Sequence, residues 1–198
     1  MTTPLLATKL VAPPPSPRSV ERQRLMQRLD AGLQGKLTLV CAPAGFGKST
    51  LLGAWVQACE HPSAWLSLDE EERDPNRFVA YLTASLRSVA ADLGEAALAQ
   101  AQARPRPSPE AVLIHLINRL DKRRGRLVLV LDDYQLASNP KVDALLSFLI
   151  DHQAHHASRS LYPLHRRAAP ELLKGNYGGM GRDRPERLLR CEPSQSFR

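Results

Sequence analysis

The nine residues Ala42–Thr50 (APAGFGKST) constrain this chain more than any other stretch. They follow a short apolar run at 37–41 and precede an apolar segment that begins at Leu51. This order predicts a strand, a glycine-containing turn and a helix, which is the arrangement of a phosphate-binding loop. In such a loop the backbone N–H groups surround an anion, and the positive end of the following helix adds to the attraction.

The whole stretch is therefore a candidate site for the phosphates of a nucleotide. Lys48 is expected to reach the β- and γ-phosphates, and the Ser49 hydroxyl is expected to bind Mg²⁺. Ala42 stands where the common form of the motif has glycine, so the loop should begin without a positive φ at that residue. The candidate phosphate-binding residues are Ala42, Pro43, Ala44, Gly45, Phe46, Gly47, Lys48, Ser49 and Thr50.

Asp132 and Asp133 follow a second apolar run at 127–131. An uninterrupted run of β-favouring residues predicts a strand buried on both faces, as in a parallel sheet. Acids at the carboxyl end of such a strand face the crevice where α/β sheets bind ligands. We expect Asp132 to bind Mg²⁺ together with Ser49, and Asp133 to be the catalytic residue that orients or deprotonates a water. The alternative is that both acids cap a helix or lie in a solvated loop.

Length and composition limit the classes of protein that remain. With 198 residues and 43% apolar side chains, the chain is long enough for one α/β domain and too apolar for general disorder. Its apolar runs are too short to cross a bilayer, and its first residues do not resemble a signal peptide. Cys41, Cys59 and Cys191 are scattered, which predicts neither a disulfide framework nor a metal cluster. These features favour a cytoplasmic protein with no membrane partner.

Three segments are predicted: an extended Pro-rich arm at 1–19, a P-loop ATP-binding domain at 20–153, and an irregular basic tail at 154–198. The tail holds nine Lys and Arg against four Asp and Glu, so it carries most of the formal net charge of +7. The acidic turn Glu70–Glu72 is interpreted as solvated. In the middle segment, strands are expected at 37–41, 64–68 and 127–131, and helices at 20–31, 48–59, 75–93, 109–120 and 140–151.

Several stretches together resemble the ATPase domain of the large ATP-dependent LuxR-type (MalT-like) transcriptional regulators, which belong to the STAND class of signalling ATPases. The resemblance covers residues 5 to about 153. The matching stretches are TKL at 8–10, VERQRL at 20–25, KLTLVCAPAGFGKSTLL at 36–52, AWLSLD at 64–69, DP at 74–75 and LVLDDY at 129–134.

The resemblance implies an α/β, three-layer P-loop NTPase of the STAND/AAA type that binds ATP or ADP with Mg²⁺. Such a domain acts as an ATP/ADP switch and is at most a slow ATPase. In this family the ATP state self-associates and a separate C-terminal module binds DNA, so DNA binding is not expected from this chain itself. Val20, Arg22 and Arg24 match the segment on the base and ribose side of the nucleotide. The alternative for the two arginines is a solvated helix face.

One departure from the family concerns the segment that follows the helix at 140–151. In the family a buried apolar strand comes next, and it lies between the strand that enters the phosphate loop and the strand that ends in Asp132. Residues 153–159 (QAHHASR) contain no apolar run. We therefore predict an incomplete sheet in a truncated or frame-altered chain, for which nucleotide binding is favoured over catalysis.

Two other classes of function stay open at the level of the sequence. One is a fragment without a competent nucleotide site, whose basic tail makes non-specific contacts. The other is a small independent NTP-dependent kinase or hydrolase, although no acceptor site is recognisable. Nucleotide binding that depends on Lys48 distinguishes the regulatory ATPase from the fragment.

Overall fold

A five-stranded parallel sheet with strand order β2-β3-β4-β1-β5 forms the centre of the molecule. The computed structural model describes residues 5–14, 22–93, 107–123, 125–152, 158–163 and 186–190. The strands are β1 (Leu37–Cys41), β2 (Ser63–Ser67), β3 (Leu127–Asp132), β4 (Ser158–Pro163) and β5 (Glu186–Arg190). Parallel neighbours need crossover connections, so the predicted α/β class is confirmed.

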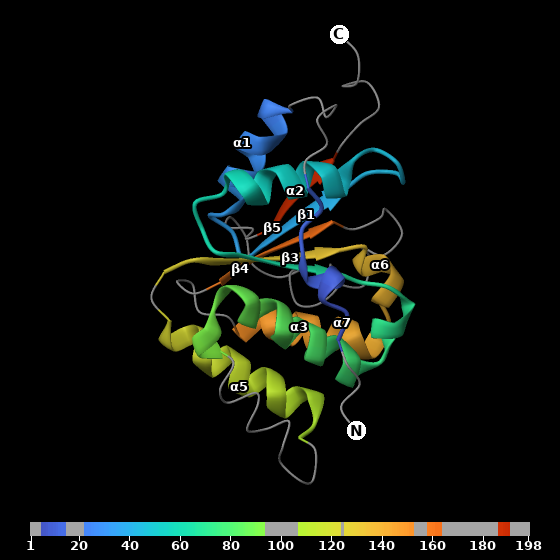
Figure 1. Cartoon of the computed structure of the whole chain (residues 1–198), viewed down its shortest axis with the longest axis vertical. Helices are drawn as coiled ribbons and strands as arrows, with labels where there is room; N and C mark the ends of the chain where they lie inside the picture. Colours follow the sequence, from blue (N-terminus) through green and yellow to red (C-terminus); the bar gives the residue numbers. More distant parts are fainter. Residues whose placement is uncertain are drawn as a thin grey trace, which may run out of the picture.

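Helices cover both faces of this sheet (Figure 1). On one face lie α1 (Gln23–Gly32) and α2 (Lys48–Ala58). On the other lie α3 (Pro75–Val89), α5 (Pro109–Lys122) and α7 (Pro140–His152). The result is the predicted three-layer domain. The remaining elements are short: η1 (Ala7–Leu10), η2 (Glu70–Arg73) and η3 (Ala91–Leu93) are 3₁₀ helices, and α6 (Tyr134–Ala137) is one α-helical turn.

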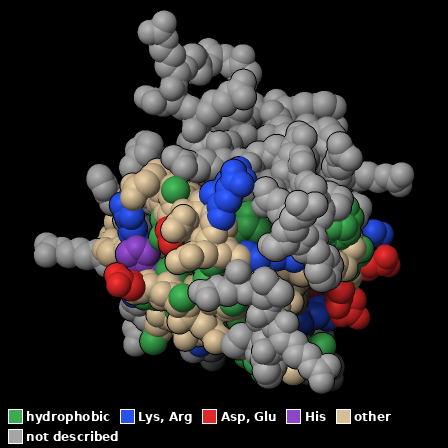
Figure 2. Space-filling view, turned by 90° about the horizontal axis from the view of Figure 1, so that it is seen from above, with side chains coloured by type: hydrophobic (Ala, Val, Ile, Leu, Met, Phe, Trp, Pro, Cys, Tyr) green, Lys and Arg blue, Asp and Glu red, His purple; other side chains and the backbone are tan. Residues whose placement is uncertain are grey.

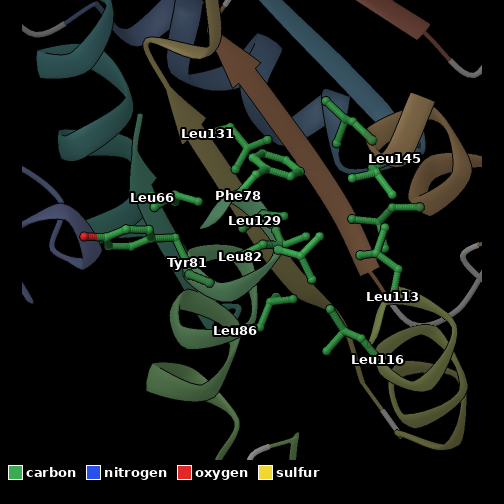
Figure 3. Packing of buried hydrophobic residues seen from close by; sticks show 14 of the residues in the cluster. Leu66, Phe78, Tyr81, Leu82, Leu86, Leu113, Leu116, Leu129, Leu131 and Leu145 are labelled. Carbon is green, nitrogen blue, oxygen red and sulfur yellow. The ribbon is translucent and has the colours of Figure 1, made fainter. Parts of the chain in front are cut away.

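Alternation along the central strands divides the core into two apolar layers. Successive side chains of a strand point to opposite faces, so β1 and β3 contribute to both layers. The larger layer packs against α3, α5 and α7 (Figure 3). It includes Leu66, Phe78, Tyr81, Leu82, Leu86, Leu113, Leu116, Leu129, Leu131 and Leu145. The smaller layer faces α1 and α2 and includes Leu29, Val40, Leu52, Trp55, Trp65, Val128 and Val130.

Two helices begin at the cap-and-proline signals that predict them. Asp74 caps α3, with its side chain accepting a hydrogen bond from the Arg77 N–H at 2.8 Å. Ser108 caps α5 in the same way, accepting from the Ala111 N–H at 3.2 Å. In each case the next residue is proline, which has no N–H to leave unsatisfied in the first turn. These local signals fix the start of both helices on the larger apolar layer.

The expectation of a gap in the sheet was wrong. Strand β4 lies between β1 and β3, pairing Leu37 with Ser160 on one side and Leu129 with Ser160 on the other. Strand β5 then pairs with the far edge of β1. Two stretches of the segment expected to be an irregular tail are therefore strands. An inner strand can be held by backbone hydrogen bonds to both of its neighbours. Such bonds do not require apolar side chains, so the strand cannot be recognised from a run of apolar residues.

The N-terminal arm also differs from the extended segment that its prolines predict. Residues 7–10 form η1, which lies against the outer strand β2 and against α3. Farther along, the arm passes over α2, where a Cβ added to Gly53 would lie 2.7 Å from the Pro13 carbonyl oxygen. The arm thus lies along the β2 edge of the sheet and touches helices of both outer layers. Covering an edge strand in this way blocks unwanted strand pairing.

No helix among the described residues is long and apolar enough to cross a membrane. Figure 2 shows the molecule from the side that carries α1 and α2. Acidic and basic side chains both occur among the coloured residues of this view, and neither kind gathers there into one broad patch.

Candidate nucleotide-binding site

The phosphate-loop candidate has the backbone of an anion-binding turn. Gly45 and Gly47 have φ values of +82° and +73°, which L side chains rarely adopt. Apart from the adjacent residues of the chain, no described residue has a heavy atom within 4 Å of a Cβ built at either glycine, so the conformation rather than the space requires glycine there. Gly47 caps α2, and its carbonyl accepts the Leu51 N–H at 2.9 Å. Ala42 is buried and has no positive φ, so the loop begins in ordinary backbone.

Lys48 is the first residue of α2 and is folded back onto the loop. Its side chain is buried, and Nζ donates hydrogen bonds to the Ala42 carbonyl at 3.1 Å and to the Pro43 carbonyl at 3.2 Å. These two carbonyls hold the ammonium charge of Lys48 close to the glycine turn. That charge is available to an anion bound above the N–H groups of the loop.

Ser49 and Asp132 meet although 83 residues separate them in the sequence. The Ser49 hydroxyl donates to Asp132 Oδ1 at 3.0 Å, which joins the start of α2 to the end of β3. Asp132 is 5% exposed. Burial raises the pKa of its carboxyl group, and the nearby charge of Asp133 adds to the rise. The Ser49 hydrogen bond and the Lys48 charge act in the opposite direction.

Replacing Asp132 by asparagine should stabilise the ligand-free protein at neutral pH. A carboxyl group with a raised pKa binds more protons in the folded state than in the unfolded state. The free energy of unfolding therefore decreases as the pH rises through the window between the ordinary and the raised pKa, and it stays reduced above that window. The amide of the substituted side chain would keep an oxygen for Ser49 without the buried charge. Thermal unfolding checks this, and a lower midpoint for Asp132→Asn at pH 7.5 would contradict it.

Asp133 adopts a backbone conformation that few non-glycine residues adopt. Its φ and ψ are 57° and 32°, and among the described residues it is the only non-glycine residue with a positive φ. Its N–H donates to Asp132 Oδ1 at 3.2 Å, and its own Oδ1 accepts from Gln135 Nε2 at 2.9 Å. Left-handed backbone at a non-glycine residue costs on the order of 1 kcal/mol and is concentrated at functional sites.

The three candidates for the base and ribose side lie in different situations. Arg22 Nη1 donates to the Phe46 carbonyl at 3.1 Å, so this arginine binds the backbone of the loop itself. Arg24 is exposed on α1, as in the alternative of a solvated helix face. Val20 lies outside the described residues. Only Arg22 of the three is therefore joined to the candidate site within the described part of the chain.

The acidic turn after β2 is not simply solvated, and its neutralising partner is on the N-terminal arm. Lys9 Nζ lies 2.6 Å from Asp69 Oδ2 and 2.7 Å from Glu72 Oε2, and Glu72 is fully buried. Arg77 Nε donates to Glu72 Oε1 at 3.2 Å and also pairs with Glu71. We name this group of Lys9, Asp69, Glu72 and Arg77 the arm clasp. The carboxylates of Asp69, Glu72 and the adjacent Glu71 come close enough together for a metal ion, but Lys9 and Arg77 already pair with them.

Sequence reasoning missed the arm clasp and Gln135. The clasp brings together residues 63 positions apart, and no local pattern marks Lys9 as buried. The sequence holds one weak signal for Gln135. Its amide side chain lies two residues after the candidate catalytic acid Asp133, in the short helix α6 that begins directly after that acid. Without the tertiary contacts, neither Lys9 nor Gln135 could be distinguished from an ordinary polar residue.

A parallel sheet, a glycine turn that leads into a helix, and a Ser–Asp contact between that helix and the end of strand β3 define a P-loop NTPase domain. The sequence matches the AAA ATPase domain family over residues 17–162. The chain therefore belongs to the AAA ATPase domain family. The match extends through most of β4, the strand that the sequence pattern alone did not predict.

Curated relatives are longer proteins. The chain is 33% identical over 165 residues to the HTH-type transcriptional regulator MalT of Yersinia enterocolitica, an alignment with 81% of this chain and 18% of that protein. It is also 33% identical over 158 residues to the serine/threonine-protein kinase PknK of Mycobacterium tuberculosis, with 78% of this chain and 14% of the kinase. The chain thus spans less than a fifth of the length of these relatives, and its resemblance to the ATPase domain of MalT-like regulators is confirmed.

Solved structures agree on the fold. A Walker-type ATPase of Pyrococcus abyssi superposes with a TM-score of 0.54 at 18% identity, covering 90% of this chain and 56% of that protein. The Drosophila ORC bound to DNA gives a TM-score of 0.54 at 14% identity, covering 88% of this chain and 43% of the matched chain. At such identities the likeness supports the P-loop NTPase fold and nothing finer.

Proposed function

We propose that this domain binds ATP or ADP with Mg²⁺ and acts as the nucleotide switch of a MalT-like transcriptional regulator. The observation that carries the proposal is the hydrogen bond of 3.0 Å between Ser49 and Asp132 at the end of the glycine turn. A hydroxyl and a buried carboxylate placed side by side beneath a phosphate loop are the protein ligands that Mg²⁺ uses with nucleotide phosphates.

The residues present fit both the metal and the phosphates. Oxygen donors suit Mg²⁺, and the two protein oxygens leave its remaining positions to phosphate and water. The loop amides and Lys48 supply the positive side of the phosphate site. Bound Mg²⁺ would offset the negative charge of the β- and γ-phosphates. We also propose that Arg22, which binds the loop at Phe46, lies toward the base and ribose side of the nucleotide.

The affinity for ATP should depend on Mg²⁺ in the wild type and depend on it less in Asp132→Asn. An uncharged amide oxygen is a poorer Mg²⁺ ligand than a carboxylate, so we expect the increase in affinity on adding Mg²⁺ to fall by about 10-fold, or 1.4 kcal/mol. Titration of a fluorescent ATP analogue in Mg²⁺ and in EDTA measures the affinity with and without the metal ion. Asp121→Asn is a matched control because Asp121 is exposed on α5.

Equal binding in Mg²⁺ and EDTA by the wild type would reject the proposed metal site. Weak and metal-independent signals from every variant would instead favour a fragment without a competent nucleotide site. For the switch itself, we expect sedimentation velocity to show more self-association in ATP than in ADP. The same sedimentation profile in both nucleotides would limit the proposal to nucleotide binding.

A further inference from the structure

Gln135 lies beside the candidate catalytic acid in a way that the nucleotide site described above does not use. It belongs to α6, the single helical turn that begins directly after Asp133. Its side-chain Nε2 donates to Asp133 Oδ1 at 2.9 Å. This bond occupies one of the two carboxylate oxygens and leaves Oδ2 of Asp133 to accept a further hydrogen bond.

The hydrogen bond also settles which way the Gln135 amide points. A carboxylate can only accept, so the amide must present its nitrogen to Asp133 and turn its oxygen the other way. That oxygen, Oε1, is buried and has no hydrogen-bond partner among the described residues. A buried acceptor without a donor is costly, and a water molecule is the usual donor that satisfies one. Oε1 of Gln135 and the second carboxylate oxygen of Asp133 are therefore the two acceptors of this pair to which a water can donate hydrogen bonds.

The backbone around this pair is held firmly. The positive φ of Asp133 turns the chain so that the side chain two residues later returns to its carboxylate. The residues on either side of Gln135 in α6 are also held, since the Tyr134 hydroxyl donates to Asp143 Oδ1 at 2.6 Å and Arg73 Nε donates to the Leu136 carbonyl at 2.9 Å. These contacts fix α6 against α7 and η2. A rigid support of this kind is what a positioned catalytic water requires.

We propose that Gln135 is a positioning residue that holds, together with Asp133, the water that attacks the γ-phosphate of ATP. The inference rests on the proposed nucleotide site. The water donates one hydrogen bond to Asp133 Oδ2 and the other to Gln135 Oε1, and these two bonds direct the oxygen of the water toward the γ-phosphate. As the bond from the water oxygen to the γ-phosphorus forms, the bond from phosphorus to the β–γ bridging oxygen breaks. Asp133 takes up the proton of the attacking water, and the products are ADP and phosphate.

In this arrangement Asp133 and Gln135 have different roles in the reaction. Asp133 receives the proton, whereas Gln135 only orients, as glutamines do for the attacking water of GTPases. The chemistry would then be separable from binding, because neither residue belongs to the glycine turn that holds the phosphates. The experiment must therefore compare turnover with nucleotide affinity in the same variants.

Gln135→Leu and Gln135→Glu should both lower the turnover number for ATP by about 10- to 100-fold. Leucine removes donor and acceptor, whereas glutamate keeps the size and the acceptor but cannot donate to Asp133 at neutral pH. Dissociation constants for ATP and ADP should stay within about 2-fold of the wild type. Gln27→Leu, at an exposed glutamine of α1, is the matched control. Single-turnover phosphate release, equilibrium titration and thermal unfolding of each variant supply the three readouts.

Three results would overturn the proposal. Turnover by both Gln135 variants equal to that of the wild type would do so directly. A loss of affinity that matches the loss of turnover would make Gln135 a structural residue. A wild type that binds ATP but does not hydrolyse it would also contradict the water-holding pair while leaving the proposed nucleotide site intact. Failure of the wild type to bind ATP at all would instead mark the failure of the proposed function.

Discussion

Replacing Lys9 by methionine is expected to lower the free energy of unfolding by about 3 kcal/mol, at the low end of what breaking a buried ion pair costs. Methionine keeps the length of the side chain but leaves Glu72 with one cation fewer in a fully buried position. Arg77 remains as a partner of Glu72, which is why we expect the lower value. Chemical denaturation measures the effect, and Lys141→Met, at an exposed lysine of α7, is the control.

The arm clasp should persist through the neutral pH range. Burial alone would lower the pKa of Lys9, but its hydrogen bonds to Asp69 and Glu72 outweigh burial and raise it. The hydrogen bond from Lys9 lowers the pKa of Asp69. The stabilising contribution is therefore lost as the pH falls through the lowered pKa of Asp69, and again as it rises through the raised pKa of Lys9. Equal stability of Lys9→Met and the wild type at pH 7.5 would contradict this account of the clasp.

Replacing Lys48 by methionine should weaken the binding of ATP by about 10- to 100-fold. A charged hydrogen bond to phosphate is worth about 1.5–3 kcal/mol, and each 1.4 kcal/mol corresponds to a factor of ten in affinity. In the free protein this ammonium is held by the carbonyls of Ala42 and Pro43, so it is already placed at the loop. Titration with a fluorescent ATP analogue measures the change. Lys141→Met again serves as the control, and unchanged affinity in Lys48→Met would place the nucleotide elsewhere.

The parts of the fold that the sequence predicted are those with strong local signals. The strands around 37–41 and 127–131 are buried apolar runs, and the helices at Pro75 and Pro109 start with a capping residue and a proline. Strand β4 was missed because its sequence, SRSLYP, has no apolar run or alternation. Its place is set by the open hydrogen-bonding edges of β1 and β3, which exist only once the sheet has formed.

The candidate site shows the same division between local and tertiary information. The glycine turn and the pair of acids were predictable as separate motifs, and the loop conformation follows from Gly45 and Gly47. That Ser49 meets Asp132 depended on β1 and β3 lying in one parallel sheet. The contact of Gln135 with Asp133 depended further on one backbone angle, the positive φ of Asp133, which few non-glycine residues adopt. No sequence rule marks such a residue in advance.

The central claim is that the glycine turn, Ser49 and Asp132 together hold one nucleotide with its metal. Native mass spectrometry of the wild type mixed with ATP and Mg²⁺ tests it most directly, because the bound mass reports both the nucleotide and the ion. We predict one ATP and one Mg²⁺ for each chain, at a nucleotide concentration that leaves Lys48→Met free. The same bound mass on the wild type and on Lys48→Met, or no bound nucleotide on either, would contradict the claim.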